Sequence, residues 1–258
     1  MTAEASKPKP RRRWQWIILV SLTGLCLSSL AVVLLLRARE QRAAVKWVRQ
    51  MGGSVNYDYL PDVFGAECFD EVTSIYLNFT QVDDLTPLPE LKSVEMLYLG
   101  NTQVSDLNSL PRLPSLRWMT LEGSPVSDLA PLAKLTSLET LFLDNTQVDD
   151  LTSLPKLPSL YYLDLSNTQV SDLTPLAGLK NLRVLILDNT PVSDLTPLAE
   201  SKRIEFLSLT GTQVTDLTPL AGLTRLGTIN IHNTPVSKKQ VRQLRKALPN
   251  LYNIHSSP

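Results

Sequence analysis

The chain has 258 residues, 43% of them hydrophobic, and its 25 basic and 25 acidic side chains leave a formal net charge of zero. Its two cysteines exclude a disulfide scaffold, because Cys26 lies inside an apolar segment that is long enough to cross a membrane. Residues 1–50 hold ten basic and two acidic residues, whereas residues 51–258 hold 15 basic and 23 acidic residues. The larger, acidic part argues against nucleic-acid binding, which requires a basic surface.

The apolar segment is residues 16–36, which contain no charged side chain. About 20 such residues suffice to cross a bilayer core of about 30 Å, so the segment predicts a transmembrane helix preceded by a basic tail, residues 1–15. No small-residue cleavage site follows it, which favours an uncleaved anchor. Arg11, Arg12 and Arg13 favour a cytoplasmic tail by the positive-inside rule, with the rest of the chain on the other side. Five basic residues after the segment leave the opposite orientation open.

Residues 37–71 are predicted to form a juxtamembrane helix and an N-terminal cap. Apolar residues recur at helical spacing before a Gly-Gly pair, and residues 54–60 then alternate as a strand does. The simpler interpretation is a cap that covers the edge of the structure that follows, since an open sheet edge must be covered. A dimerising juxtamembrane helix is the alternative.

Residues 72–236 carry a motif that occurs eight times at a fixed step of 22 residues. In each unit two apolar residues stand two apart, as Leu97 and Leu99 do, which predicts a short strand. Leucines three apart follow, as Leu107 and Leu110 do, which predicts a tight 3₁₀ turn. Such units must stack on one another to bury their apolar side chains. The unit is marked by a valine at a fixed position: Val82, Val104, Val126, Val148, Val170, Val192, Val214 and Val236.

The predicted fold class is therefore an α/β-type solenoid, an arc with a parallel β-sheet on its concave face and short 3₁₀ or helical turns on its convex face. The N-terminal transmembrane helix precedes it. In residues 237–258 the repeat pattern breaks, and a C-terminal cap helix is expected, with Ser237 as N-cap and Val241, Leu244 and Leu248 facing the last coil.

The segments LGNTQVSDLNSL and LSNTQVSDLTPLAGLKNL resemble the 22-residue leucine-rich repeats of bacterial internalins. The whole chain is similar to membrane-anchored bacterial proteins of this type, and the resemblance implies a binding module rather than an enzyme. In the family an Asn usually hydrogen-bonds the turn backbone between coils. Here that position carries a hydroxyl, which is expected to do the same: Thr80, Thr102, Ser124, Thr146, Thr168, Thr190, Thr212 and Thr234.

A row of aspartates recurs just before the 3₁₀ turns. Stacked carboxylates could hold Ca²⁺, but a single file does not supply six or more converging oxygen ligands. An Asp at this place also accepts backbone N–H bonds as a helix N-cap does, and we expect that role. The row consists of Asp84, Asp106, Asp128, Asp150, Asp172, Asp194 and Asp216.

The sequence contains no group of residues that is typical of a catalytic site. It has two histidines, no nucleophile elbow, no glycine-rich phosphate loop and no Cys/His cluster. We therefore predict no catalytic residue, no metal site, no cofactor and no small-molecule substrate.

The candidate site is the concave strand face, whose side chains point away from the leucines. An aromatic stripe runs beside an acidic one, and large aromatic residues outside a core are typical of binding hot spots. Strands also favour aromatic residues for their own sake, and the stripe can pack against itself. The aromatic members are Tyr76, Tyr98, Trp118, Phe142, Tyr162 and Phe206, and the acidic members are Glu122, Asp144, Asp164 and Asp188.

Together these features predict a single-pass scaffold or receptor, in a bacterial inner membrane with its repeats on the non-cytoplasmic side. It would bind an unidentified protein partner through the concave face. The alternative is a carbohydrate- or cell-wall-binding surface protein that uses the same aromatic residues.

Overall fold

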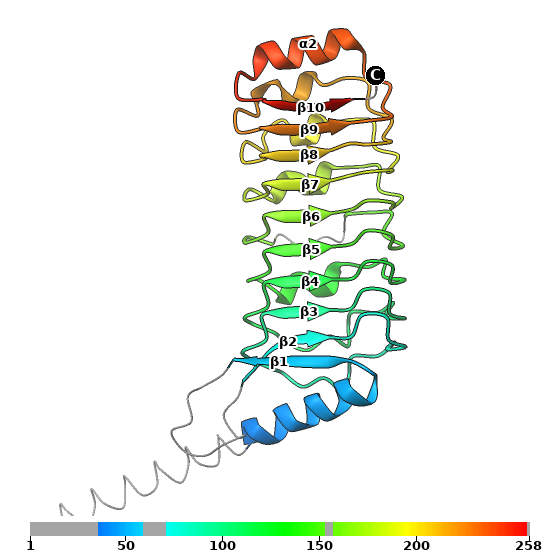
Figure 1. Ribbon diagram of the computed structural model, residues 1–258, viewed down its shortest axis with the longest axis vertical. Coiled ribbons are helices and arrows are strands. Elements are labelled where there is room, and N and C mark those ends of the chain that lie inside the picture. Colours follow the sequence, from blue (N-terminus) through cyan, green and yellow to red (C-terminus); the bar gives the residue numbers. More distant parts are fainter. Residues whose placement is uncertain (1–35, 59–70, 153–156, 257–258) are drawn as a thin grey trace, which may run out of the picture.

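The computed structural model describes residues 36–58, 71–152 and 157–256. They form an elongated solenoid in which each coil adds one short strand to a single sheet along one side (Figure 1). The ten strands follow one another in chain order across the sheet. All neighbours pair in parallel except β1, which is antiparallel to β2. The predicted solenoid with a parallel sheet is confirmed.

The strands of the repeats are short: β2 has six residues, and each later coil turns back after three or four extended residues. They are β2 (Glu71–Tyr76), β3 (Met96–Tyr98), β4 (Trp118–Thr120), β5 (Thr140–Phe142), β6 (Tyr162–Asp164), β7 (Val184–Ile186), β8 (Phe206–Ser208) and β9 (Thr228–Ile231).

The middle residue of each three-residue strand is buried, and the following leucine is buried too, as Leu97 and Leu99 show. The residues on either side of that middle position turn to the other face of the sheet. Because the step is constant, the buried leucines and valines of successive coils join into one core cluster. Each coil therefore depends on its neighbours for the burial of its apolar side chains.

The turns behind the sheet include four 3₁₀ helices: η1 (Ala130–Lys134), η2 (Thr174–Gly178), η3 (Thr196–Leu198) and η4 (Thr218–Gly222). Each has a proline in its first turn, where the missing N–H is not needed. Each also buries one leucine of the three-residue series, such as Leu176 in η2. The predicted 3₁₀ turns are confirmed in these coils.

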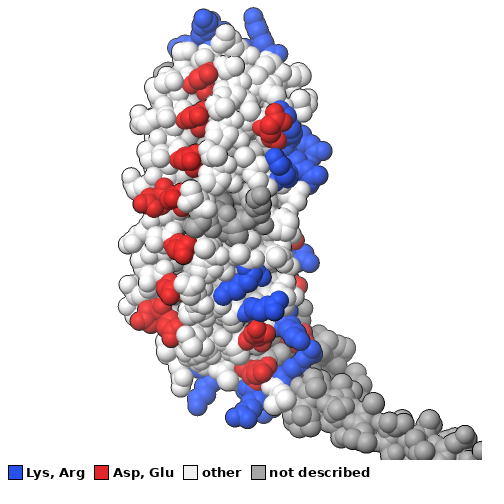
Figure 2. Space-filling view, turned by 180° about the vertical axis from the view of Figure 1, so that it is seen from behind, with Lys and Arg blue, Asp and Glu red and all other residues white. Residues whose placement is uncertain are grey.

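The aspartate row lies just before the turns behind the sheet and accepts backbone N–H bonds there. Asp194 Oδ1 accepts from the backbone N–H of Thr196 at 2.8 Å and from its Oγ1 at 2.6 Å. The same bond to the N–H two residues later recurs in all seven members. The prediction that these aspartates accept backbone N–H bonds is confirmed, although the N-cap residue of each 3₁₀ helix is the leucine that follows the aspartate. Figure 2 shows a column of acidic side chains along one edge of the back face, with other acidic side chains beside Lys and Arg on the opposite edge.

The hydroxyl row behaves differently from the expectation. Thr102 Oγ1 donates to the carbonyl of Leu99 at 2.7 Å, and the other seven hydroxyls make the same bond within their own coils. The expected bonds between coils are therefore wrong. A hydroxyl has one proton on a short stem, and the carbonyl three residues back in the tight turn is nearer than a coil about 4.8 Å away.

Both ends of the described solenoid are covered. Residues 36–50 are helical and bury Ala44 and Val48 against the first coils, followed by β1 (Ser54–Asp58). At the other end, α2 (Lys238–Ala247) starts at Ser237, whose side chain accepts from Gln240 N, and it buries Leu244.

A last strand, β10 (Asn253–Ser256), pairs in parallel with β9 and was not foreseen. Helix α2 lengthens this coil, so Ile254 rather than Leu251 lies opposite Ile229, which hides the strand from a 22-residue pattern.

The predicted transmembrane segment, residues 16–36, lies outside the described residues except for Leu36. Within the ranges that the structure describes, no helix combines the length and the apolar character that a membrane crossing requires.

The stacked core predicts a large penalty for truncating a central leucine. Leu163 is fully buried between two neighbouring coils, so Leu163→Ala should lower the free energy of unfolding by about 2–5 kcal/mol. Denaturant unfolding of the full chain measures this. Gln169→Ala, at an exposed position of the same coil, is the control and should stay within about 0.5 kcal/mol. Equal losses from the two variants would contradict the assignment of inside and outside.

Candidate binding face of the sheet

The sheet surface turned away from the leucine core, called here the open face, is organised in three columns by the strand register. Corresponding residues of successive strands lie directly opposite one another, as Met96 and Trp118 do. The first column contains Met96, Trp118, Thr140, Tyr162, Val184 and Phe206. The second contains Tyr76, Tyr98, Thr120, Phe142, Asp164 and Ile186. The third follows the strands and contains Asn78, Gly100, Glu122, Asp144, Ser166 and Asp188.

The predicted aromatic residues largely contact one another. Tyr76 and Tyr98 stack with ring centroids 4.6 Å apart and an interplanar angle of 9°. Phe142 lies 5.3 Å from Trp118 and 4.8 Å from Tyr162, in tilted geometry. The spacing between neighbouring strands, about 4.8 Å, brings rings on adjacent strands into contact.

As a result these side chains do not point freely into solvent. All six predicted aromatic residues of the open face, Phe206 included, are half-buried. Of the two interpretations of the stripe, packing of the rings against one another is the one seen for Tyr76, Tyr98, Trp118, Phe142 and Tyr162, and these rings form an ordered surface.

The acidic residues divide by their surroundings. Asp164 is half-buried and accepts from the N–H of Ser166 at 2.9 Å and from its Oγ at 2.5 Å. Burial raises the pKa of Asp164 above its ordinary value, and the Asp144 and Asp188 carboxylates raise it further against the lowering by Ser166. Burial, followed by the charges of Asp164 and Asp144, raises the pKa of Tyr162 to about 12, so its hydroxyl stays protonated.

Asp188 and Glu122 both lie against a neighbouring coil. Asp188 Oδ1 accepts from Ser208 Oγ at 2.5 Å and from Thr210 N at 2.9 Å. Glu122 lies over Gly100, so closely that a side chain at position 100 would overlap its carboxylate.

Sequence reasoning missed Phe79, which stands at the end of the first coil. Its backbone is left-handed, with φ of 60°, and its side chain is 77% exposed. Other coils place Asn or Gly at this left-handed position, as Asn101 and Gly123 show. A bulky residue is rare in this conformation, and the signal that could have found it is an aromatic residue in an Asn/Gly column.

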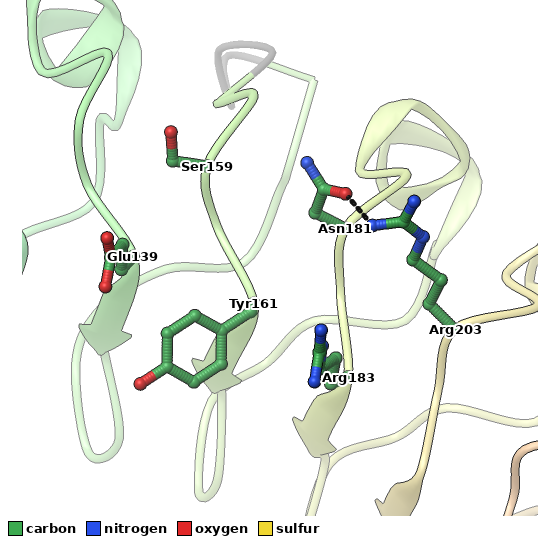
Figure 3. Close-up of a pocket in the computed structure, with 6 residues that line it drawn as sticks. All are labelled: Glu139, Ser159, Tyr161, Asn181, Arg183 and Arg203. Atoms are coloured by element: carbon green, nitrogen blue, oxygen red, sulfur yellow. Dashed lines mark hydrogen bonds between the residues drawn. The ribbon is translucent and has the colours of Figure 1, made fainter.

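A shallow polar pocket lies where the chain enters the strands β5 to β8 (Figure 3). It was also not predicted. Arg203 donates to Asn181 Oδ1 at 2.6 Å, and Arg183 lies 3.7 Å from a carboxylate oxygen of Glu205. Both cations therefore have partners within the chain. The pocket is lined by Glu139, Ser159, Tyr161, Asn181, Arg183 and Arg203.

The pKa shifts predict opposite pH dependence for two aspartates. Hydrogen bonds from Thr196 lower the pKa of Asp194, so its ionised form adds stability above the ordinary value of 3.8, and this is lost as pH falls through the folded-state value. Asp164 has a raised pKa, so the folded state favours its neutral form below 3.8 and loses that stability as pH rises through the folded-state value. Relative to wild type, Asp164→Asn should therefore gain thermal stability as pH rises from about 2 to about 7, and Asp194→Asn should lose it.

Thermal unfolding midpoints of the two variants across this pH range check the prediction, and each variant is the control for the other. The same sign of pH dependence in both would contradict the desolvated position of Asp164.

The fold, with one strand and one tight turn per 22-residue coil, defines a leucine-rich-repeat protein. Residues 158–200 match the family described as Leucine Rich repeats (2 copies). No curated protein sequence gives a significant match.

Among solved structures, internalin C2 from Listeria monocytogenes is 29% identical, with a TM-score of 0.65 over 72% of this chain and 81% of that chain. An internalin F from the same organism is 23% identical, with a TM-score of 0.52 over 71% of this chain and 68% of that chain. Human 5T4, also titled trophoblast glycoprotein, is 17% identical, with a TM-score of 0.59 over 72% and 77% of the two chains, and shows the fold alone. In its repeats and its fold the chain is similar to internalins.

Proposed function

We propose that this protein is a membrane-anchored scaffold or receptor that binds a protein partner through the open face of its sheet, without catalysis. The observation that carries the proposal is the row of ordered, half-buried aromatic side chains beside carboxylates on a rigid sheet. Leucine-rich-repeat proteins generally serve as binding scaffolds for other proteins.

The aromatic rings of the open face are held in place by contacts with one another, which favours binding. Tyr76 is already stacked on Tyr98, and Phe142 is already held between Trp118 and Tyr162. Because these side chains are already ordered, less side-chain entropy is lost when a partner docks on them than when it docks on mobile side chains. Aromatic anchors that are surrounded by other contacts are also the residues on which binding energy concentrates.

Charge selects the kind of partner. The open face carries Glu122, Asp144, Asp164 and Asp188 within four successive coils, and a partner with basic and apolar groups complements it. The desolvation of Asp164 adds to this preference, because a cation placed beside it would relieve the repulsion from Asp144 and Asp188.

The anchor belongs to the proposal as well. The uncharged segment 16–36 runs directly into the helical residues 36–50, so an anchored chain would hold the capped N-terminal end of the solenoid near the bilayer. The strands that follow would then extend away from it.

A carbohydrate partner is the second candidate, because sugars also stack on aromatic rings. The parallel stacking of Tyr76 on Tyr98 favours a protein partner, since it covers ring faces that a sugar would use. Capture of glycans instead of proteins in the experiment below would decide for the second candidate.

The test is crosslinking capture from native membranes with the full chain, as wild type and as Trp118→Ala. We expect the variant to weaken partner binding by about 2 kcal/mol or more, because interface energy concentrates in such residues. Trp118 packs against Phe142, so the unfolding midpoint of the variant is measured in parallel to separate lost binding from lost stability.

Lys180→Glu is the control, because Lys180 is exposed on the side of the 3₁₀ turns. Lys134, on the same side, is less suitable, since its ammonium donates to the carbonyl of Leu110 and it is half-buried. Loss of capture in Lys180→Glu, with capture intact in Trp118→Ala, would place the working surface on the turns and overturn the proposal.

The proposed orientation has its own test. With Arg11, Arg12 and Arg13 holding the tail in the cytoplasm, protease added to intact spheroplasts that express the full chain should digest the repeats. A cytoplasmic marker protein is the control for intact membranes. Repeats that stay protected until lysis would show that the basic residues after the segment determine the orientation instead.

A further inference from the structure

Strand β4 differs from the other strands in its hydrogen bonding. Among the described residues, three buried side-chain polar atoms have no hydrogen-bond partner: Trp118 Nε1, Thr120 Oγ1 and Glu122 Oε2. All three belong to the open face of one coil. Buried polar groups almost always find partners, and a group of exceptions at one place indicates that a partner comes from outside the chain.

The shape around Thr120 supports this. Thr120 is only 6% exposed and lies opposite Tyr98 on β3 and Phe142 on β5. Its short side chain therefore forms the floor between two aromatic residues. Strands two apart are separated by about 9.6 Å, so a flat group between the two rings would lie about 4.8 Å from each.

The position of Glu122 depends on Gly100. A Cβ at residue 100 would overlap the Glu122 carboxylate, and Gly100 does not have the left-handed backbone that would require glycine by itself. The glycine is thus explained by the space that it leaves for the carboxylate. The absence of a side chain at Gly100 lets the Glu122 carboxylate lie against the sheet, close to Thr120.

We propose that the open face of β4 is a subsite for an arginine side chain of the protein partner. A guanidinium is planar, stacks on aromatic rings and carries five N–H donors, which suit the Glu122 carboxylate and Thr120 Oγ1. The Trp118 indole N–H is a donor and would bond a main-chain carbonyl of the same partner segment. This inference rests on the proposed function and names the chemistry that the binding face recognises.

Arginine fits better than the other candidates. A lysine ammonium would satisfy the carboxylate but has no flat face for the rings. A neutral sugar would leave Glu122 without a counter-charge, next to the further acidic residues Asp144 and Asp164.

The experiment uses the full chain in detergent micelles and follows the indole N–H resonance of Trp118 by NMR, assigned with Trp118→Phe. The probes are three blocked tripeptides, acetyl-Gly-Xaa-Gly-amide, in which Xaa is arginine, lysine or citrulline. Citrulline has almost the shape of arginine without its charge. We expect the arginine peptide to shift the resonance and to bind about tenfold or more tightly than the citrulline peptide, the ratio that loss of one charged hydrogen bond gives.

Two variants separate charge from position. Glu122→Gln should reduce arginine binding to the level of citrulline, and Gly100→Ala should weaken it by displacing the carboxylate while keeping its charge. Asp149→Asn, an exposed residue next to the capping aspartate Asp150, removes one charge elsewhere and should change nothing. Amide spectra of each variant confirm that the fold is kept.

Equal affinity for arginine and citrulline, unchanged arginine affinity in Glu122→Gln, or no shift of Trp118 with any peptide would overturn the subsite. If partner capture from membranes still depends on Trp118 in that case, the protein-binding function stands and only the arginine subsite fails.

Discussion

The burial of leucine columns between coils is the constraint on which the rest of this structure depends. A single coil exposes too much of its apolar surface to be stable, and only the neighbouring coil covers it. Leu163, Leu165 and Val170 are fully buried in this way, and their counterparts in the other repeats follow the same pattern. A constant step of 22 residues is the condition for such columns to meet, so the core fixes the register of everything outside it.

On the open face this register brings some side chains into favourable contacts and others into unfavourable ones. Residues at equivalent positions are forced to lie about 4.8 Å apart whatever their chemistry. Tyr76 and Tyr98 gain from that distance by stacking. Asp164 is disfavoured as an anion, because burial raises its pKa and the Asp144 and Asp188 carboxylates of the neighbouring coils raise it further. The core stabilises the coils strongly enough to carry such repulsion, and a carboxylate that would relax away on a flexible surface is retained on this one.

Sequence periodicity predicts those features that repeat, and it fails where one coil differs from the next. The 3₁₀ turns and the Asp194 type of hydrogen bond depend on residues within one coil, and the buried leucines depend on contacts that are the same in every coil, so the spacing was enough to predict them. The half-burial of Trp118 and the position of Glu122 over Gly100 depend on which residues stand in the neighbouring coils. The strand β10 was not predicted from the 22-residue pattern, because α2 lengthens its coil.

The same reasoning indicates where function resides in a repeat protein. A residue that keeps the repeat pattern is already explained by the fold, because any coil at that place would need it. Phe79 breaks the Asn/Gly pattern of its column, and this departure costs a strained backbone. Trp118 stands in a column whose residues vary from coil to coil, and its buried indole N–H has no partner among the described residues. Features that cost stability persist when something other than the fold requires them, and these two lie on or beside the face that carries the aromatic rings.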